Sequence, residues 1–354
     1  MARMLAVRPG LDEVEPYVSP QLPARYRMNT NECPYPPPPA VVEEVVAALR
    51  ATGLNRYPDR DAGELMDALA DHVGTRRDRL AVANGSNEIL LQLFQTYGGP
   101  QRKVLVFEPT YSLHTLIPRI TGTPVVHEMR GAGYRIDPVS AARAIAGERP
   151  DLILACSPNN PTGSTEGGDV LRALAEAAPG LVIVDEAYIE FAGEGASVLP
   201  LLDEYPNLVA VRTFSKAWRL AGARIGYLLA SPDVVADLAR VRLPYHLGAL
   251  TQAVGVAALR YASETSEVVE RVVAERCRIE RGLRAAGIEP LPSSANFVLF
   301  PVSDAGAVWR ALLEQGVLVR NYPGSSELSG HLRVTAGLPE ETDAFLSALA
   351  RALA

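Results

Sequence analysis

The sequence has few cysteines, no surplus of basic residues and no long hydrophobic run. Its three cysteines, Cys33, Cys156 and Cys277, are odd in number and far apart, which argues against a disulfide framework or a CxxC metal motif and fits a reducing cytoplasm. A formal net charge of −7 argues against a nucleic-acid binder. No apolar run approaches the roughly 18 residues of a membrane span, and the N-terminal residues lack the apolar segment of a secretory signal. We therefore expect a soluble cytoplasmic protein that binds neither nucleic acid nor membranes.

What the chain does contain is enough apolar sequence for a large core, since 48% of its 354 residues are hydrophobic. This length favours one large domain and one smaller domain. Residues 1–40 are irregular, and the consecutive prolines Pro36 to Pro39 exclude a helix interior or a central strand there. We expect an extended N-terminal arm at 1–40 that packs on the small domain or a partner subunit, a large domain at 41–260 and a small domain at 261–354.

Short apolar runs alternate with helical patterns through the middle of the chain. The runs lie at 80–82, 104–107, 152–155, 181–184 and 208–211. Continuous apolar runs are typical of parallel strands that are covered on both faces, so we predict an α/β fold with a mainly parallel central sheet covered by helices. The pattern changes after about residue 245. A long helical segment at 263–286, strand patterns at 296–300, 317–320 and 332–335, and a final helix predict a smaller α+β domain.

Polar residues follow these apolar runs, and in open α/β sheets ligands bind beyond the carboxyl ends of the strands. The run at 208–211 leads to Thr213, Ser215 and Lys216, and Arg224 lies eight residues beyond the lysine. Hydroxyl groups and a guanidinium are suited to hold phosphate oxygens. We interpret Lys216 as a Schiff-base lysine beside a phosphate-binding cup.

A second anion-binding element is predicted at Gly85-Ser86-Asn87, which follows the first apolar run and opens a helix. Free backbone N–H groups and the positive end of the helix dipole attract an anion at such a position. The alternative is that the side chain of Ser86 or Asn87 caps the helix and binds nothing else. The hydroxyl groups and the arginine near Lys216 favour the phosphate site.

Asp185 ends a wholly apolar run, so its carboxylate needs a partner. It could cap a helix or lie in a surface turn. It could also face the protonated pyridine nitrogen of a cofactor and so keep that cofactor an electron sink. In that case Tyr111 could stack on the ring face, and Asn160 and Tyr188 could hydrogen-bond the ring hydroxyl.

Several short motifs follow one another along the chain in a characteristic order and spacing. They are Glu15-Pro16-Tyr17, Asn29-Thr30-Asn31-Glu32, Asn55-Arg56-Tyr57-Pro58-Asp59, Glu108-Pro109-Thr110-Tyr111, Asn160-Pro161-Thr162-Gly163, Asp185-Glu186-Ala187-Tyr188, Ser215-Lys216-Ala217 with Arg224, Leu243-Pro244-Tyr245, Asn296-Phe297, Leu318-Val319-Arg320 and Leu332-Arg333-Val334. Together they resemble the aspartate aminotransferase superfamily of pyridoxal phosphate (PLP) enzymes with the type I fold. Within that superfamily the chain resembles the histidinol-phosphate aminotransferases from end to end. Trp218-Arg219 departs from the commonest pattern but removes no catalytic group.

The resemblance implies a homodimer with shared active sites and PLP-dependent ping-pong transfer of an amino group between L-histidinol phosphate/imidazole acetol phosphate and glutamate/2-oxoglutarate in histidine biosynthesis. It implies Lys216 as the Schiff-base lysine and proton shuttle, Asp185 at the pyridine nitrogen, Asn160 and Tyr188 at the ring oxygen, and Tyr111 on the ring face. It also implies Ser86, Asn87, Thr213, Ser215, Arg224 and the partner subunit's Tyr57 at the cofactor phosphate. The implied substrate-binding residues are Tyr17, Asn31, Tyr57, Arg320 and Arg333.

Other functions remain to be weighed. An aromatic aminotransferase is the closest alternative, because Arg320 and Arg333 suit a carboxylate as well as a phosphate, and a PLP-dependent decarboxylase is a third. A dinucleotide-binding oxidoreductase would need a glycine-rich turn that opens a helix, and Gly131-Ala132-Gly133 lacks that context. A PLP-binding transcription regulator would need a DNA-binding segment before Tyr17. We predict no metal site, and we interpret Cys156 as a small core residue and His72, His114, His127, His246 and His331 as surface or boundary residues.

Overall fold

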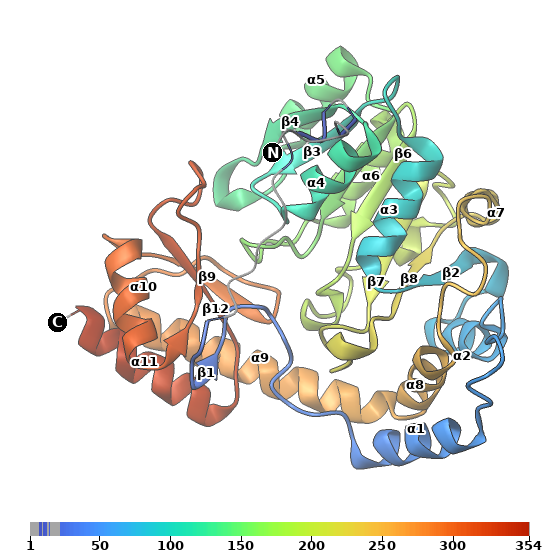
Figure 1. Cartoon of the computed structure of the whole chain (residues 1–354). Coiled ribbons are helices and arrows are strands. Elements are labelled where there is room, and N and C mark those ends of the chain that lie inside the picture. Colours follow the sequence, from blue (N-terminus) through green and yellow to red (C-terminus); the bar gives the residue numbers. More distant parts are fainter. Residues whose placement is uncertain (1–6, 9, 13, 15–21, 354) are drawn as a thin grey trace, which may run out of the picture.

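The computed structural model describes residues 7, 8, 10–12, 14 and 22–353, and its largest sheet has seven strands (Figure 1). The strand order is β2-β8-β7-β6-β5-β3-β4, and β8 is antiparallel to both of its neighbours while the other pairs are parallel. The predicted mainly parallel sheet is therefore confirmed. Its strands are β2 (Leu80–Ala83), β3 (Val104–Glu108), β4 (Val125–Met129), β5 (Leu152–Cys156), β6 (Leu181–Asp185), β7 (Leu208–Thr213) and β8 (Gly226–Leu229).

The apolar runs form strands because both of their faces are buried. Alternate residues of β3 enter different cores: Leu105 and Phe107 pack into one hydrophobic cluster, and Val104 and Val106 pack into the other. Helices cover both faces, as expected for a parallel sheet. They are α1 (Pro39–Ala51), α2 (Gly63–Val73), α3 (Ser86–Tyr97), α4 (Leu113–Thr121), α5 (Pro138–Glu148), α6 (Gly168–Ala177), α7 (Pro232–Leu238) and α8 (Ala249–Arg260), with short 3₁₀ turns η1 (Arg77–Arg79), η2 (Ala132–Tyr134), η3 (Ile189–Phe191), η4 (Leu199–Leu201) and η5 (Ala221–Ala223).

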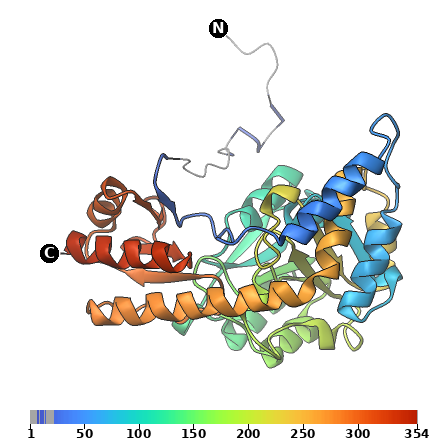
Figure 2. The same cartoon turned by 90° about the horizontal axis from the view of Figure 1, so that it is seen from below.

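The C-terminal part forms a second, antiparallel sheet in the order β11-β12-β9. The predicted long helix is α9, which runs from the end of α8 past the second sheet (Figures 1 and 2). The glycine-rich segment at 131–133 opens the short 3₁₀ turn η2 and not an α-helix, unlike the strand-to-helix turn of a dinucleotide-binding motif. The elements of this part are α9 (Ala262–Ala285), β9 (Phe297–Pro301), α10 (Ala305–Glu314), β10 (Val317–Leu318), β11 (Arg320–Asn321), β12 (His331–Thr335) and α11 (Pro339–Leu353).

The single strand predicted at 317–320 is wrong, because two short strands replace it. β10 pairs in parallel with β1 (Tyr26–Arg27) of the N-terminal segment, whereas β11 pairs with β12. The N–H of Met28 donates to the carbonyl of Leu318 at 2.8 Å, and the N–H of Thr335 donates to the carbonyl of Met28 at 2.9 Å. Residues 26–28 of the N-terminal segment therefore hydrogen-bond to the C-terminal part, on both β10 and the end of β12.

The division into an arm at 1–40, a large domain at 41–260 and a small domain at 261–354 stays a prediction. Among the residues that the structure describes, the arm ends in α1, which begins at Pro39, a position where a missing N–H costs no intrahelical bond. None of the helices in this described part is long and apolar enough to span a membrane.

Candidate active site

A cavity of about 530 Å³ opens at the carboxyl ends of β5, β6 and β7, between the two sheets. Its volume is typical of small-molecule sites. Two predicted residues are not among those that line it. Tyr57 is 79% exposed and stacks on Tyr245 with ring centroids 4.4 Å apart, and Tyr17 lies outside the described residues. The predicted residues that do line it are Asn31, Ser86, Asn87, Tyr111, Asn160, Asp185, Tyr188, Thr213, Ser215, Lys216, Arg224, Arg320 and Arg333.

Lys216 lies just after β7 and extends its amine into the cavity. Its Nζ donates to the backbone carbonyl of Thr30 at 3.1 Å and lies 5.8 Å from the centre of the Tyr188 ring. Burial, followed by the nearby cation of Arg333, lowers the pKa of the Lys216 amine to about 8. A substantial fraction of this amine is therefore neutral, and hence nucleophilic, near physiological pH.

The helix α3 begins beside this lysine with its first N–H groups free of side-chain caps. Its N-cap residue is Gly85, at φ +88°, and none of the side chains that the structure describes caps the helix, so the alternative in which Ser86 or Asn87 caps it is wrong. A Cβ atom on Gly85 would come within 2.5 Å of Nη2 of Arg224, so only glycine allows the guanidinium to lie against this turn. The Nη1 of Arg224 donates to Oγ of Ser215 at 3.2 Å, and Thr213 donates to the same oxygen at 3.0 Å. The result is a cup of donors suited to a phosphate.

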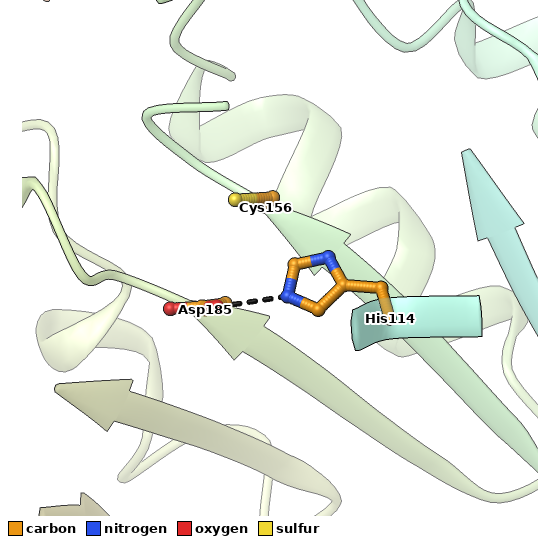
Figure 3. A group of neighbouring side chains, drawn as sticks. All are labelled: His114, Cys156 and Asp185. Atoms are coloured by element: carbon orange, nitrogen blue, oxygen red, sulfur yellow. Dashed lines mark hydrogen bonds and ion pairs between the residues drawn. The ribbon is translucent and has the colours of Figure 1, made fainter. Parts of the chain in front are cut away.

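Asp185 ends β6, and its buried carboxylate has two partners. Its Oδ1 accepts the N–H of Ala187 at 3.0 Å, and its Oδ2 lies 2.8 Å from Nε2 of His114 (Figure 3). His114 is fully buried, so the expectation of a surface or boundary histidine is wrong at this position. His114 is the second residue of α4, and its Nδ1 lies 3.0 Å from the hydroxyl oxygen of Thr110, which hydrogen-bonds it.

Cys156 is the third member of this buried group, in which the possible ligand atoms of His114, Cys156 and Asp185 lie within 4.8 Å of one another (Figure 3). Burial raises the pKa of the Cys156 thiol, and its Sγ donates to the carbonyl of Pro158 at 3.4 Å. A metal ligand has to be the thiolate. The cysteine therefore fits the predicted small buried residue, although it also lines the cavity.

The far side of the cavity is formed by Tyr188 and Arg333. The hydroxyl of Tyr188 accepts from Asn31 at 2.9 Å and from Asn160 at 3.4 Å. The guanidinium of Arg333 donates to the side-chain oxygen of Asn160 and, at 2.8 Å, to the carbonyl of Asn29. Arg320 lies directly opposite Arg333 in the pairing of β11 with β12, which brings two cations to one wall.

Comparison with known proteins accounts for this arrangement. The family model described as "Aminotransferase class I and II" matches residues 26–349. The chain belongs to this family. Its curated relatives include histidinol-phosphate aminotransferases from Frankia casuarinae (49% identity, covering 99% of this chain and 90% of the relative) and Thermobifida fusca (49% identity, 98% and 95%).

Solved structures that resemble this chain support its assignment to the aminotransferase fold. One is histidinol-phosphate aminotransferase from Sinorhizobium meliloti in complex with pyridoxal-5'-phosphate, with a TM-score of 0.90, 28% identity and coverage of 99% of this chain and 98% of the other. Another is a mutant of Thermus thermophilus aspartate aminotransferase, with a TM-score of 0.86, 26% identity and coverage of 99% and 100%. The predicted α/β fold of type I PLP-dependent transferases is confirmed.

Proposed function

We propose that this chain is a histidinol-phosphate aminotransferase that uses PLP to transfer an amino group between L-histidinol phosphate/imidazole acetol phosphate and glutamate/2-oxoglutarate in histidine biosynthesis. The observation that carries the proposal is the position of Lys216, a lysine with a depressed pKa that shares one cavity with the phosphate cup and with Asp185. The names and the 45–49% identities of the curated relatives support the substrate.

The residues present fit PLP. The cup at Gly85 provides backbone N–H groups and Arg224 for its phosphate, together with Ser86, Asn87, Thr213 and Ser215. Asp185 is a buried carboxylate for the pyridine nitrogen, and Lys216 is an amine for the aldehyde. When bound, PLP serves as an electron sink for negative charge that develops at the Cα atom of an amino substrate.

The chain's own groups then have defined tasks. The amine of Lys216, whose pKa in the ligand-free protein is lowered to about 8, would act as the general base that takes the proton from Cα of the substrate and as the acid that returns it. Asp185, held by His114, keeps a proton on the ring nitrogen. Burial raises the pKa of the Tyr188 hydroxyl, so that it remains a phenol and, with Asn160, binds the ring oxygen. Tyr111, which lines the same cavity, would cover the ring face.

Arg320 and Arg333 would bind the anionic end of each substrate. Histidinol phosphate carries a phosphate and no α-carboxylate, whereas glutamate carries two carboxylates, so a pair of guanidinium groups serves both. The side-chain nitrogen Nε of Arg333 is buried and makes no hydrogen bond within the described part of the chain. Asn31 and Tyr17 complete the proposed substrate site.

The proposal includes a homodimer with shared sites. Tyr57 would reach the cofactor phosphate of the partner subunit, and its exposure of 79% leaves the side chain available for that contact. We also place the enzyme in the cytoplasm, where Cys33, Cys156 and Cys277, all free, would stay reduced.

A single-turnover experiment tests the substrate. The PLP-loaded enzyme is mixed with histidinol phosphate, phenylalanine or tyrosine, and the decay of the visible cofactor absorbance is followed. We expect the fastest decay with histidinol phosphate, and no decay in the Lys216→Ala variant with any of them. Faster conversion of phenylalanine would favour the aromatic aminotransferase instead, and full activity of Lys216→Ala would exclude both.

A further inference from the structure

The central sheet splits at its carboxyl edge between β3 and β5. The two strands pair only from Val104 and Leu152 to Val106 and Leu154. Yet β3 continues along β4 as far as Glu108, and β5 continues along β6 as far as Cys156. The last two residues of each strand therefore lack ladder bonds to each other, although backbone polar groups buried at this depth require partners.

The side chain of Arg130 fills this split. Its Nε donates to the carbonyl of Phe107 on β3 at 3.2 Å, and its Nη2 donates to the carbonyl of Cys156 on β5 at 3.2 Å. Its Nη1 donates to Oε1 of Glu166 at 2.6 Å and to the carbonyl of Tyr134 at 3.3 Å. One fully buried guanidinium thus takes the place of the missing ladder bonds between two diverging strands.

Glu166 holds the guanidinium in place and is itself held by backbone. Its carboxylate accepts the N–H of Ile136 at 3.2 Å, and its own N–H donates to Oγ of Ser157 at 3.0 Å. The side chains of Arg130 and Glu166 are 0% and 1% exposed. Burial of an ion pair seldom gains stability over apolar packing, so a pair in this position calls for a role other than stability alone.

The diverging strand ends lead directly to residues of the cavity. Tyr111 follows β3 and Asn160 follows β5, and both line the cavity together with Glu108 and Cys156. We propose that Arg130, oriented by Glu166, is a positioning residue that sets the separation of the β3 and β5 ends, and hence that of Tyr111 and Asn160. This inference rests on the proposed function in so far as the cofactor ring lies between those two side chains.

The test compares Arg130→Met, Glu166→Gln and the double variant Arg130→Met/Glu166→Gln with the wild type. The double variant is needed because Arg130→Met alone leaves the Glu166 carboxylate buried and unpaired, whereas the added glutamine removes that charge and still accepts the N–H of Ile136. Arg79→Met is the control for the loss of an arginine that holds backbone carbonyls, although the Arg79 side chain is 21% exposed and that of Arg130 is fully buried. Arg79 also donates to two backbone carbonyls, of Leu202 at 2.8 Å and Ala230 at 3.3 Å, and pairs with Asp203, but it lies at the opposite end of β2 from the cup.

Four quantities are measured: the melting temperature, amide hydrogen exchange of the ligand-free protein in segments 108–112 and 157–163, the dissociation constant of PLP, and the circular dichroism of the visible band of bound PLP. We expect the double variant to melt at a lower temperature than Arg79→Met, because it leaves the buried carbonyls of Phe107 and Cys156 without the Arg130 donors, so exchange and PLP binding are measured at a temperature at which the double variant is folded. Its exchange should be faster in those two segments, the dichroism of its bound PLP should change, and its PLP dissociation constant should rise at least about tenfold, since small displacements at a positioned site are costly.

Each other result has a distinct meaning. Unchanged exchange, dichroism and PLP affinity in the double variant would overturn the inference, because the strand ends would then stay in place without Arg130. An equal loss of PLP affinity in Arg79→Met would overturn it too, because the effect would reflect general stability. Failure of the wild type to bind PLP would refute the proposed function, while the exchange data from the ligand-free protein would still decide whether Arg130 holds the two strand ends.

Discussion

The depressed pKa of Lys216 predicts how fast the ligand-free enzyme captures PLP as the pH changes. Only the neutral amine attacks the aldehyde, and the pKa of about 8 arises first from burial and then from the cation of Arg333. Because the pKa is lowered, most of the Lys216 amine is protonated when the pH falls below 8, and nearly all of it is neutral above pH 9. The neutral fraction rises from about 0.1 at pH 7 to about 0.9 at pH 9, whereas an ordinary lysine with a pKa near 10.4 would remain below about 0.05 at pH 9.

The two kinds of lysine differ in how much PLP capture accelerates with pH and in the shape of the pH profile. Capture by Lys216 should accelerate about tenfold between pH 7 and pH 9 and then level off, whereas capture by an ordinary lysine would accelerate roughly a hundredfold and keep rising. The rate constant is measured by stopped flow, from the absorbance of PLP mixed with ligand-free protein, and is divided by that of a small model amine to remove the ionisations of PLP itself.

The sequence makes the site of capture easy to verify. The chain contains two lysines, Lys103 and Lys216. Lys103 pairs with Glu148 at the surface, so Lys103→Arg should leave the pH profile unchanged, and borohydride reduction of that variant should fix PLP on Lys216. A rate that continues to climb beyond pH 9, or fixation of PLP on Lys103 in the wild type, would refute the reasoning.

Three further predictions concern the surroundings of this lysine. His114→Phe removes a hydrogen bond to a buried carboxylate, worth about 1.5–3 kcal/mol, and should lower the single-turnover rate constant ten- to a hundredfold, whereas the exposed His127→Phe should not. Gly85→Ala forces a side chain into a strained backbone conformation against Arg224, so unfolding measured in urea should show a loss of about 1–3 kcal/mol and equilibrium titration should show weaker PLP binding. Tyr57→Phe should weaken PLP retention on gel filtration, and mixed subunits of a Tyr57 variant and Lys216→Ala should regain part of the activity; no recovery after proven subunit exchange would contradict a shared site.

The sequence allowed the sheet and most of the cavity to be predicted, because both depend on local patterns. Apolar runs locate the buried strands, and in a parallel sheet the residues after those strands meet at one edge. Lys216, Asp185, Asn160 and Arg224 were predicted on this basis and line one cavity.

What the sequence could not supply depends on exact geometry or on distant partners. His114 reaches Asp185 only because α4 begins at Leu113, and a shift of one residue would turn the imidazole away. The role of Arg130 depends on where β3 and β5 part, which neither strand pattern records. The break between β10 and β11 depends on residues 26–28, nearly the whole chain away. The sequence signal that could have indicated His114 is its position three residues after Tyr111, just beyond the motif Glu108-Pro109-Thr110-Tyr111.

The N-terminal segment explains how a lysine and an arginine can share this cavity. A buried cation is costly unless it is hydrogen-bonded, and two cations also repel each other. Lys216 donates to the carbonyl of Thr30, and Arg333 donates to the carbonyl of the preceding residue, Asn29. Two consecutive carbonyls of one segment thus stabilise one cation from each sheet. The two carbonyls offset part of the cost of burying the cations, whereas burial first and then the nearby guanidinium of Arg333 lower the pKa of the Lys216 amine and keep it partly neutral.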